Sequence, residues 1–143
     1  MNISLIALLA SLALCALGCG GSTQDAVNVR LSAKESYEAA EEAFEAKDFS
    51  LAEKKYANAL EGGGLYPDLI ETAWVMRAIS RAELGDVDQA LNDLNELEHH
   101  AMQLDIVYAA QSFVLAKKGD SRGASVAWNK ARRINRAVKK FSD

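Results

Sequence analysis

The sequence predicts an all-α protein whose folded part is a stack of three similar helix–turn–helix units. Three short turns look alike, and each is followed at matching intervals by a small residue and then by a large apolar one. A single proline and nine glycines among 143 residues leave most of the chain free to be helical. Half of the residues are apolar, which is enough to form a core without disulfide bonds.

The N-terminal residues 1–18 are predicted to be a lipoprotein signal peptide. Residues 1–17 are almost entirely Leu, Ile and Ala with a few Ser, and no charged residue occurs before Asp25. Ala16-Leu17-Gly18-Cys19 resembles the bacterial lipobox, in which a small residue precedes a cysteine that receives lipid. The resemblance implies cleavage before Cys19, diacylglycerol on its sulfur, and an amine able to take a further acyl chain such as palmitate. The sequence departs from that pattern by having Ala16 where Leu is usual and no Lys or Arg near its start.

Residues 19–31 are expected to be the lipidated cysteine and a flexible tether, because Gly-Gly-Ser-Thr follows the cysteine. Residues 32–143 are expected to form the folded domain. Two alternatives stay open: an uncleaved anchor, since about 17 apolar residues can just span a bilayer, and ordinary secretion. The lipobox implies attachment on the extracytoplasmic side of either the inner or the outer membrane, in the cell envelope.

The repeated units cover about residues 33–66, 68–101 and 105–134. Their turns are Lys47-Asp48-Phe49, Gly85-Asp86-Val87 and Gly119-Asp120-Ser121. Three matched positions follow each turn: Ala52, Ala90 and Ala124; then Tyr56, Leu94 and Trp128; then Ala59, Leu97 and Ala131. The second and third turns are 34 residues apart, and the longer first interval contains a Gly-Gly-Gly insertion at residues 62–64, which we expect to be a flexible junction.

This pattern resembles the tetratricopeptide repeat (TPR), whose small residues lie where two antiparallel helices cross closely. The resemblance implies a short right-handed α-solenoid of three antiparallel hairpins, preceded by the signal helix. It also implies a partly buried structural ion pair between Arg77 and Asp93. Apolar residues continue at helical spacing after Ile134, so we expect the last helix to extend as a C-terminal cap to residue 141.

In TPR proteins the first helix of each hairpin lines a concave face, and the resemblance implies a partner-binding groove there. The residues that it would place in the groove are Tyr37, Glu41, Phe44, Val75, Ile79, Ile106 and Phe113. A largely apolar strip of this kind suits an amphipathic helix or an extended apolar peptide. The alternative is that the tight curl of a three-unit array simply buries these residues.

Charge is distributed unevenly along the chain. The net charge of −4 argues against nucleic-acid binding, which needs a basic surface. Residues 35–61 contain eight acidic residues and three lysines, whereas residues 130–140 contain six basic residues and no acid. The basic stretch suits a solvated helix face, contact with anionic lipid headgroups, or head-to-tail self-association.

The sequence contains no catalytic or metal-binding motif, so we expect neither an enzyme nor a bound cofactor or metal ion. His99 and His100 are adjacent, and neighbouring residues on a helix point about 100° apart, which disfavours joint chelation. The leading prediction is an adaptor lipoprotein that holds a protein or peptide partner at the cell envelope. The alternative is a structural subunit that self-associates or docks permanently in a larger envelope complex.

Overall fold

The computed structural model describes residues 23–141, and every regular element in that range is an α-helix. The six helices are α1 (Thr23–Glu45), α2 (Phe49–Glu61), α3 (Pro67–Glu83), α4 (Val87–Glu98), α5 (Leu104–Lys117) and α6 (Ser121–Ile134). The predicted all-α class is therefore confirmed for this part of the chain. Cys19 and the predicted signal peptide lie outside the described residues.

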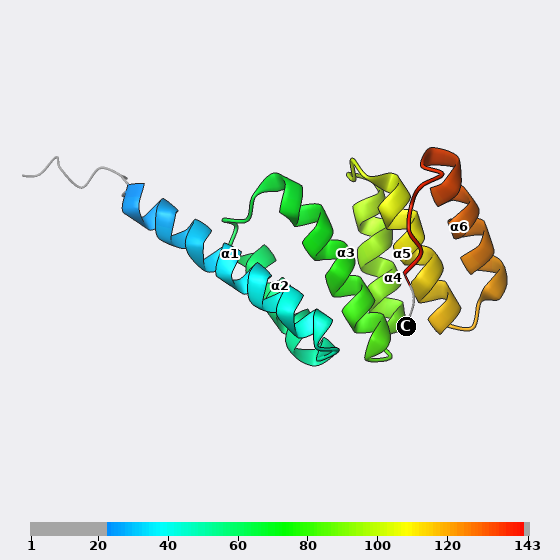
Figure 1. Cartoon of the computed structure of the whole chain (residues 1–143), viewed down its shortest axis with the longest axis horizontal. Helices are drawn as coiled ribbons and strands as arrows, with labels where there is room; N and C mark the ends of the chain where they lie inside the picture. Colours follow the sequence, from blue (N-terminus) through cyan, green and yellow to red (C-terminus); the bar gives the residue numbers. More distant parts are fainter. Residues whose placement is uncertain (1–22, 142–143) are drawn as a thin grey trace, which may run out of the picture.

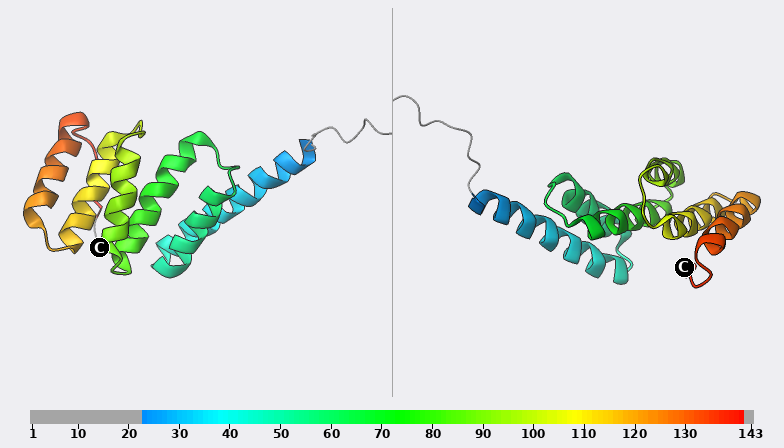
Figure 2. Two further views of the ribbon diagram at one scale, coloured as in Figure 1. Left: turned by 180° about the vertical axis from the view of Figure 1, so that it is seen from behind. Right: turned by 90° about the horizontal axis from the view of Figure 1, so that it is seen from above.

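The helices are arranged in a row that follows their order in the chain (Figures 1 and 2). Each helix turns back on the one before it, and every helix has extensive contact with the next. The helices α3 and α5 also touch each other, although α4 separates them in sequence. No helix of the described part is long and apolar enough to cross a membrane.

The three turns that the sequence singled out share one backbone geometry. Their first residues have positive φ angles, 59° at Lys47, 92° at Gly85 and 88° at Gly119. In each turn the following Asp donates its backbone N–H to a carbonyl oxygen five residues earlier, at 2.9 Å, as in a Schellman helix end. The side chains of Asp48 and Asp120 cap the next helix by accepting backbone N–H bonds at 3.1 and 2.8 Å. Asp86 makes no such side-chain bond.

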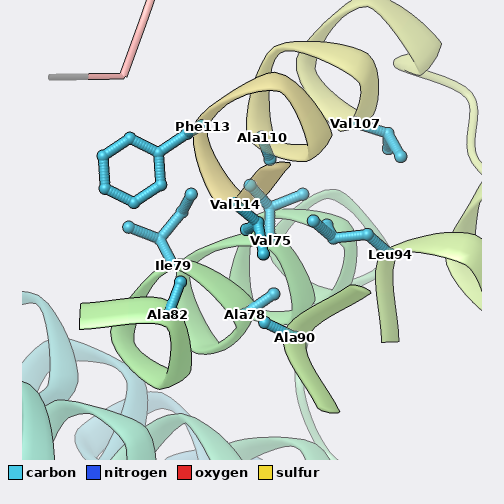
Figure 3. Close-up of a cluster of buried hydrophobic side chains, with 10 residues drawn as sticks. All are labelled: Val75, Ala78, Ile79, Ala82, Ala90, Leu94, Val107, Ala110, Phe113 and Val114. Atoms are coloured by element: carbon cyan, nitrogen blue, oxygen red, sulfur yellow. The ribbon is translucent and has the colours of Figure 1, made fainter. Parts of the chain in front are cut away.

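The small residues after each turn lie where the helices cross. Ala52 and Ala90 are fully buried and Ala124 is nearly so. One apolar cluster joins α1, α2 and the start of α3 around Tyr56. A second joins α3, α4 and α5 around Leu94, and Figure 3 shows its side chains converging from these helices.

The glycine insertion between α2 and α3 packs closely against α1. A Cβ at Gly64 would lie 2.7 Å from the carbonyl oxygen of Val29, which is closer than real Cβ atoms come to other atoms. Gly63 has a φ of +65°, in the region that favours glycine. The insertion therefore needs glycine both for its backbone angles and for close approach to α1.

Two sequence predictions are corrected by the helix boundaries. Residues 23–31, predicted to be part of a flexible tether, are helical, since α1 begins at Thr23 and no Gly or Pro interrupts it. The last helix ends at Ile134 and does not continue to residue 141. It ends because Asn135 has extended backbone angles, φ −135° and ψ 110°. The side-chain oxygen of Asn135 also accepts a hydrogen bond from the Ala137 N–H at 2.9 Å, and such local bonds compete with the helix.

Candidate functional site

One open hollow is lined by side chains from α1, α2, α3 and α5. Phe44 comes from α1, Ile79 from α3 and Phe113 from α5. The hollow has a volume of about 380 Å³ and also has Phe49 and Phe141 in its walls. Three of the predicted groove residues therefore meet at one place.

The hollow is strongly aromatic. Phe44 and Phe49 meet edge to face, with ring centroids 5.4 Å apart and an interplanar angle of 73°. Phe113 and Phe141 meet in the same manner, at 6.5 Å and 65°. Figure 3 shows Phe113 and Ile79 lying next to each other at one edge of the α3–α5 core. A surface of this composition suits an apolar or aromatic side chain of a ligand.

Charged residues surround the aromatic walls. Glu45, Lys47 and Glu83 line the same hollow. Glu83 accepts a bond from Lys117 Nζ at 2.8 Å, and the ammonium group lies 5.2 Å from the centre of the Phe113 ring. The hollow thus has an apolar floor and a polar rim, as peptide-binding surfaces commonly have.

Ile106 lines a second hollow, of about 360 Å³, between α5 and residues 135–141. This hollow and the aromatic one share Phe141. The C-terminal segment, defined as residues 135–141, therefore passes along the predicted groove.

Val75 does not belong to an open groove. Its side chain is 1% exposed and packs in the α3–α5 core beside Leu94. For Val75 the structure favours the alternative reading, in which the tight curl buries the residue. Phe113 is also mostly buried, at 5% exposed, so it offers only one edge to the hollow.

Tyr37 and Glu41 lie at the packed face between α1 and α2. The hydroxyl of Tyr56 donates to a carboxylate oxygen of Glu41, and Tyr37 lies edge-on against Tyr56 with centroids 5.9 Å apart. Burial and the nearby Glu41 carboxylate raise the pKa of Tyr37 to about 12. The same two causes raise the pKa of Tyr56 above its ordinary value. These residues stabilise the first pair of helices and do not line the aromatic hollow.

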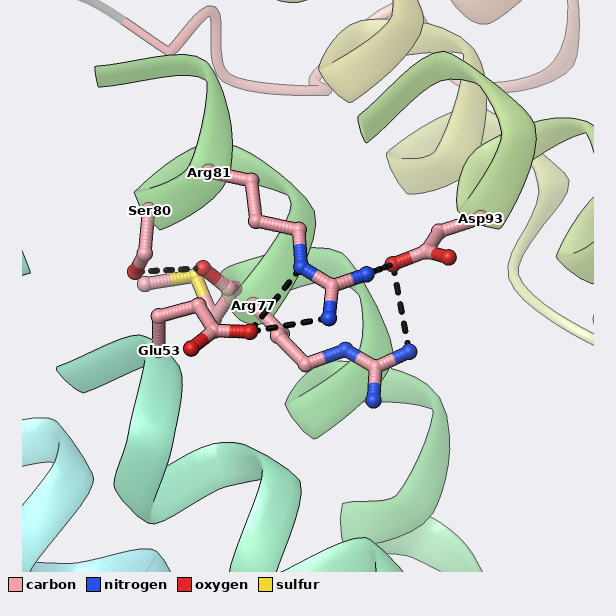
Figure 4. Close-up of polar contacts among 6 residues, drawn as sticks. Glu53, Arg77, Ser80, Arg81 and Asp93 are labelled. Carbon is pink, nitrogen blue, oxygen red and sulfur yellow. Dashed lines mark hydrogen bonds and ion pairs between the residues drawn. The ribbon is translucent and has the colours of Figure 1, made fainter. Parts of the chain in front are cut away.

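The predicted ion pair between Arg77 and Asp93 is present. Arg77 Nη2 lies 3.1 Å from Asp93 Oδ2, and both side chains are largely buried (Figure 4). The Arg77 guanidinium also lies 4.2 Å above the Trp74 ring. Sequence reasoning missed Arg81, which donates to the same Asp93 oxygen and to Glu53 on α2. The pair is therefore one half of a four-residue network that links α2, α3 and α4.

The third unit has Gln111 at the position of Arg77, and its contacts differ. Gln111 donates to Asn95 and Glu98 on α4, at 3.1 and 3.0 Å. Glu98 also accepts from the Tyr108 hydroxyl at 2.8 Å. The hydrogen bonds that Glu98 accepts from Gln111 and Tyr108 lower the pKa of Glu98, and the bond from Gln111 is the largest cause. The same bond between Tyr108 and Glu98 raises the pKa of Tyr108. Hydrogen bonds thus join α5 to α4 at the position that matches the ion pair between α3 and α4.

Another apolar hollow, of about 380 Å³, lies at the ends of α3 and α4. It is lined by Ile70, Trp74, Leu97 and Met102 among others. His100 also lines it, and the His99 and His100 rings lie 6.4 Å apart. Within residues 23–141 no three His, Cys, Asp or Glu side chains are grouped so as to hold a metal ion.

Sequence reasoning did not assign Phe49 or Phe141 to the groove. Phe49 is the third residue of the first turn, and the other two turns have Val87 and Ser121 at that position. The larger aromatic side chain of Phe49 was the available sign that it has a separate role. Phe141 was attributed to a helical cap because of its spacing, although the segment that carries it is not helical. Comparisons with protein-family models, curated proteins and solved structures give no match to this chain.

Proposed function

We propose that the protein is a non-enzymatic adaptor of the TPR type, anchored to a membrane of the cell envelope and binding a protein or peptide partner. Its folded part would be a short right-handed solenoid of three hairpins. The observation that carries the proposal is the meeting of Phe44, Ile79 and Phe113 around one open hollow. Arrays of this type bind peptides on a surface to which the first helix of every unit contributes.

The repeat assignment is supported by the shared turns. Lys47, Gly85 and Gly119 all have left-handed backbone angles, although only two of them are glycines. A bulky residue in this conformation is uncommon, so its appearance at the matched position supports the equivalence of the three units. The burial of Ala52 and Ala90 at matched positions supports it further.

The anchoring part of the proposal concerns Cys19 and is tested by metabolic labelling with a radioactive or clickable fatty acid. We expect the wild-type chain to incorporate label and Cys19→Ser to lose it. Cys15→Ser is the matched control, since it removes a thiol four residues away in the same stretch. Equal labelling of wild type and Cys19→Ser would exclude Cys19 as the acylated residue.

The binding part is tested by crosslinking and affinity capture from envelope extracts. Phe44→Glu and Phe49→Glu each place a charge in the hollow at a half-buried position. Phe113→Glu is a poorer probe because its charge would enter the core. Leu51→Glu is the control, because Leu51 is 42% exposed on α2. We expect both groove variants to lose partners that wild type and Leu51→Glu retain; identical partners for all four chains would refute the groove.

The alternative function is a structural subunit that stacks on itself. The observation in its favour is the charge difference between acidic residues 35–61 and basic residues 130–140. Size-exclusion chromatography with light scattering at low and high salt separates the two functions. An adaptor stays monomeric, whereas a self-stacking subunit forms oligomers that salt disperses.

A further inference from the structure

The C-terminal segment turns back sharply after α6. Asn135 Nδ2 donates to the Asp105 carboxylate at 2.8 Å, which fixes the turn to the first turn of α5. The Val138 N–H then donates to the Asn135 carbonyl at 3.2 Å. The chain therefore leaves α6 and returns across α5.

From this turn the segment follows the predicted groove. Its beginning faces Ile106, and its last described residue, Phe141, reaches Phe113 beside the aromatic hollow. Figure 1 shows the segment passing from the end of α6 across α5, and it is not helical. The protein thus places its own non-helical segment where a peptide is expected to bind.

The chemistry of the segment complements the groove. It carries Arg136, Lys139 and Lys140 and no acidic residue. The acids Glu45, Glu83 and Asp105 lie along the two hollows that it borders. Its aromatic side chain, Phe141, is the one that packs against the aromatic wall. Lys47 lines the aromatic hollow as well, and Lys117 pairs with Glu83, so the rim carries both signs of charge. The segment thus brings basic side chains to a rim that contains acids, and it places one ring on the apolar wall.

The segment is only lightly held. Most of its side chains are exposed, including Arg136 and the two lysines, and Phe141 is half-buried. About 380 Å³ of open space remains between Phe141 and the Phe44–Phe49 side of the hollow. An occupant that leaves this much of the site unfilled can be replaced by one that fills it.

We propose that the C-terminal segment is a built-in competitor for the partner, and that the partner presents the same chemistry: a basic peptide with an aromatic side chain. This inference rests on the proposed function, because it takes the groove to be the binding site. Tethering holds the segment near the groove at a high effective concentration. The partner's apparent affinity is therefore reduced by the fraction of molecules in which the segment occupies the groove.

The test measures binding of a fluorescein-labelled peptide with the sequence of residues 135–141, Asn-Arg-Ala-Val-Lys-Lys-Phe, to the full-length protein by fluorescence anisotropy. Phe141→Ala removes the competing ring and leaves the other walls of the hollow in place. Asn135→Ala instead releases the turn from Asp105 and changes no side chain that lines the aromatic hollow. We expect both variants to bind the peptide at least ten-fold more tightly than wild type.

Two control peptides separate the aromatic and charge contributions. One replaces the final Phe with Ala, and the other replaces Arg and both Lys with Glu. We expect each control peptide to bind the Phe141→Ala variant at least ten-fold more weakly than the original peptide binds it. Circular dichroism establishes whether each variant is folded. If Phe141→Ala is unfolded, the test is made with Asn135→Ala.

The proposal is overturned if wild type and the folded variants bind the peptide equally, or if none binds it. It is also overturned if light scattering shows a wild-type dimer that Phe141→Ala dissociates, because the segment would then occupy the groove of a second copy. If peptide binding fails while Phe44→Glu still loses its captured partners, the proposed function stands and the built-in competitor does not.

Discussion

Arg81 of α3 donates through Nε and Nη2 to one carboxylate oxygen of Glu53 on α2, at 3.0 and 2.8 Å. Its remaining terminal nitrogen, Nη1, donates to Asp93 on α4, which also pairs with Arg77. Two arginines and two acids therefore form a network without net charge, and Figure 4 shows it extending between the helices. Arg77 is only 8% exposed, so this part of the network is buried.

Asp93→Ala should be markedly destabilising, because it removes the shared partner of Arg77 and Arg81. The Asp93 and Arg77 side chains are 16% and 10% exposed, so the loss exceeds that of a surface pair. We expect the free energy of unfolding to fall by about 2–3 kcal/mol, typical of lost hydrogen bonds to buried charged groups. Urea denaturation followed by circular dichroism measures it.

The matched control is Asp88→Ala. Asp88 pairs with Lys118 at 2.8 Å, but its side chain is 81% exposed. Surface pairs of this kind contribute about 0–1 kcal/mol because solvent screens them. Equal losses for the two substitutions would show that the buried network is no more stabilising than a surface contact.

Lys47→Gly should stabilise the protein. Lys47 has a φ of 59°, and a side chain in this left-handed region costs about 1 kcal/mol relative to glycine. Glycine also gains conformational freedom in the unfolded chain, so the expected net gain is about 0.5 kcal/mol. Thermal denaturation measures this change, and Gly85→Ala and Gly119→Ala should lower the melting temperature at the matched positions. A lower melting temperature for Lys47→Gly would contradict the argument from backbone angle.

Gly64→Ala should destabilise the contact between the α2–α3 loop and α1. Its new Cβ would lie 2.7–2.9 Å from backbone atoms of Val29 and Arg30, which cannot move independently of the helix. The expected loss is about 1–3 kcal/mol, as for other overpacked sites. Gly62→Ala is the control, because its Cβ would meet only ordinary contacts at 3.5 and 3.9 Å in a helical conformation. Similar unfolding energies for the two variants would mean that the loop does not pack on α1 in solution.

Acid should weaken the junction between α4 and α5 through Glu98. Bonds from Gln111 and Tyr108 lower the pKa of Glu98 below its ordinary value of 4.5. A carboxyl group whose pKa is lowered by folding contributes stability that is present above pH 4.5 and is lost as the pH falls through the folded pKa. Glu98→Gln should flatten the part of the stability profile that lies below pH 4.5. Urea denaturation across that range measures it, and an unchanged slope would assign the acid sensitivity to other carboxyl groups.

The helical units could be predicted from sequence because their signals are local. A left-handed turn followed by a small residue at fixed spacing depends on backbone angles and on close helix crossing, which neighbouring residues determine. The Arg77–Asp93 pair was implied by the TPR resemblance, and its two residues lie 16 positions apart on neighbouring helices. Arg81 could not be assigned this way, because its second partner, Glu53, lies in the preceding unit and 28 residues away.

The groove was predicted less well than the helices. Which of the predicted groove residues stay accessible depends on how helices from different parts of the chain pack on one another, and no local pattern gives that geometry. Val75 and Phe113 are buried by this packing, whereas Phe44 remains half-buried at the hollow. Apolar residues at helical spacing after Ile134 suggested a continued helix, but the Asn135 side chain accepts from the Ala137 N–H and donates to Asp105, and the helix ends there. The bond to Asp105 joins residues 30 apart, so a local pattern reveals only part of the reason.

The order in which the helices touch affects how the protein responds to mechanical load. Apart from α3 with α5, the helix pairs with extensive contact are consecutive in the chain. In such a row, each unit depends mainly on its neighbours and can open without unfolding the far end. Tension applied at the N-terminus would therefore act first on α1, and α1 carries Phe44. A pull on this end would separate one wall of the hollow from Ile79 and Phe113 while the helices behind them stay folded.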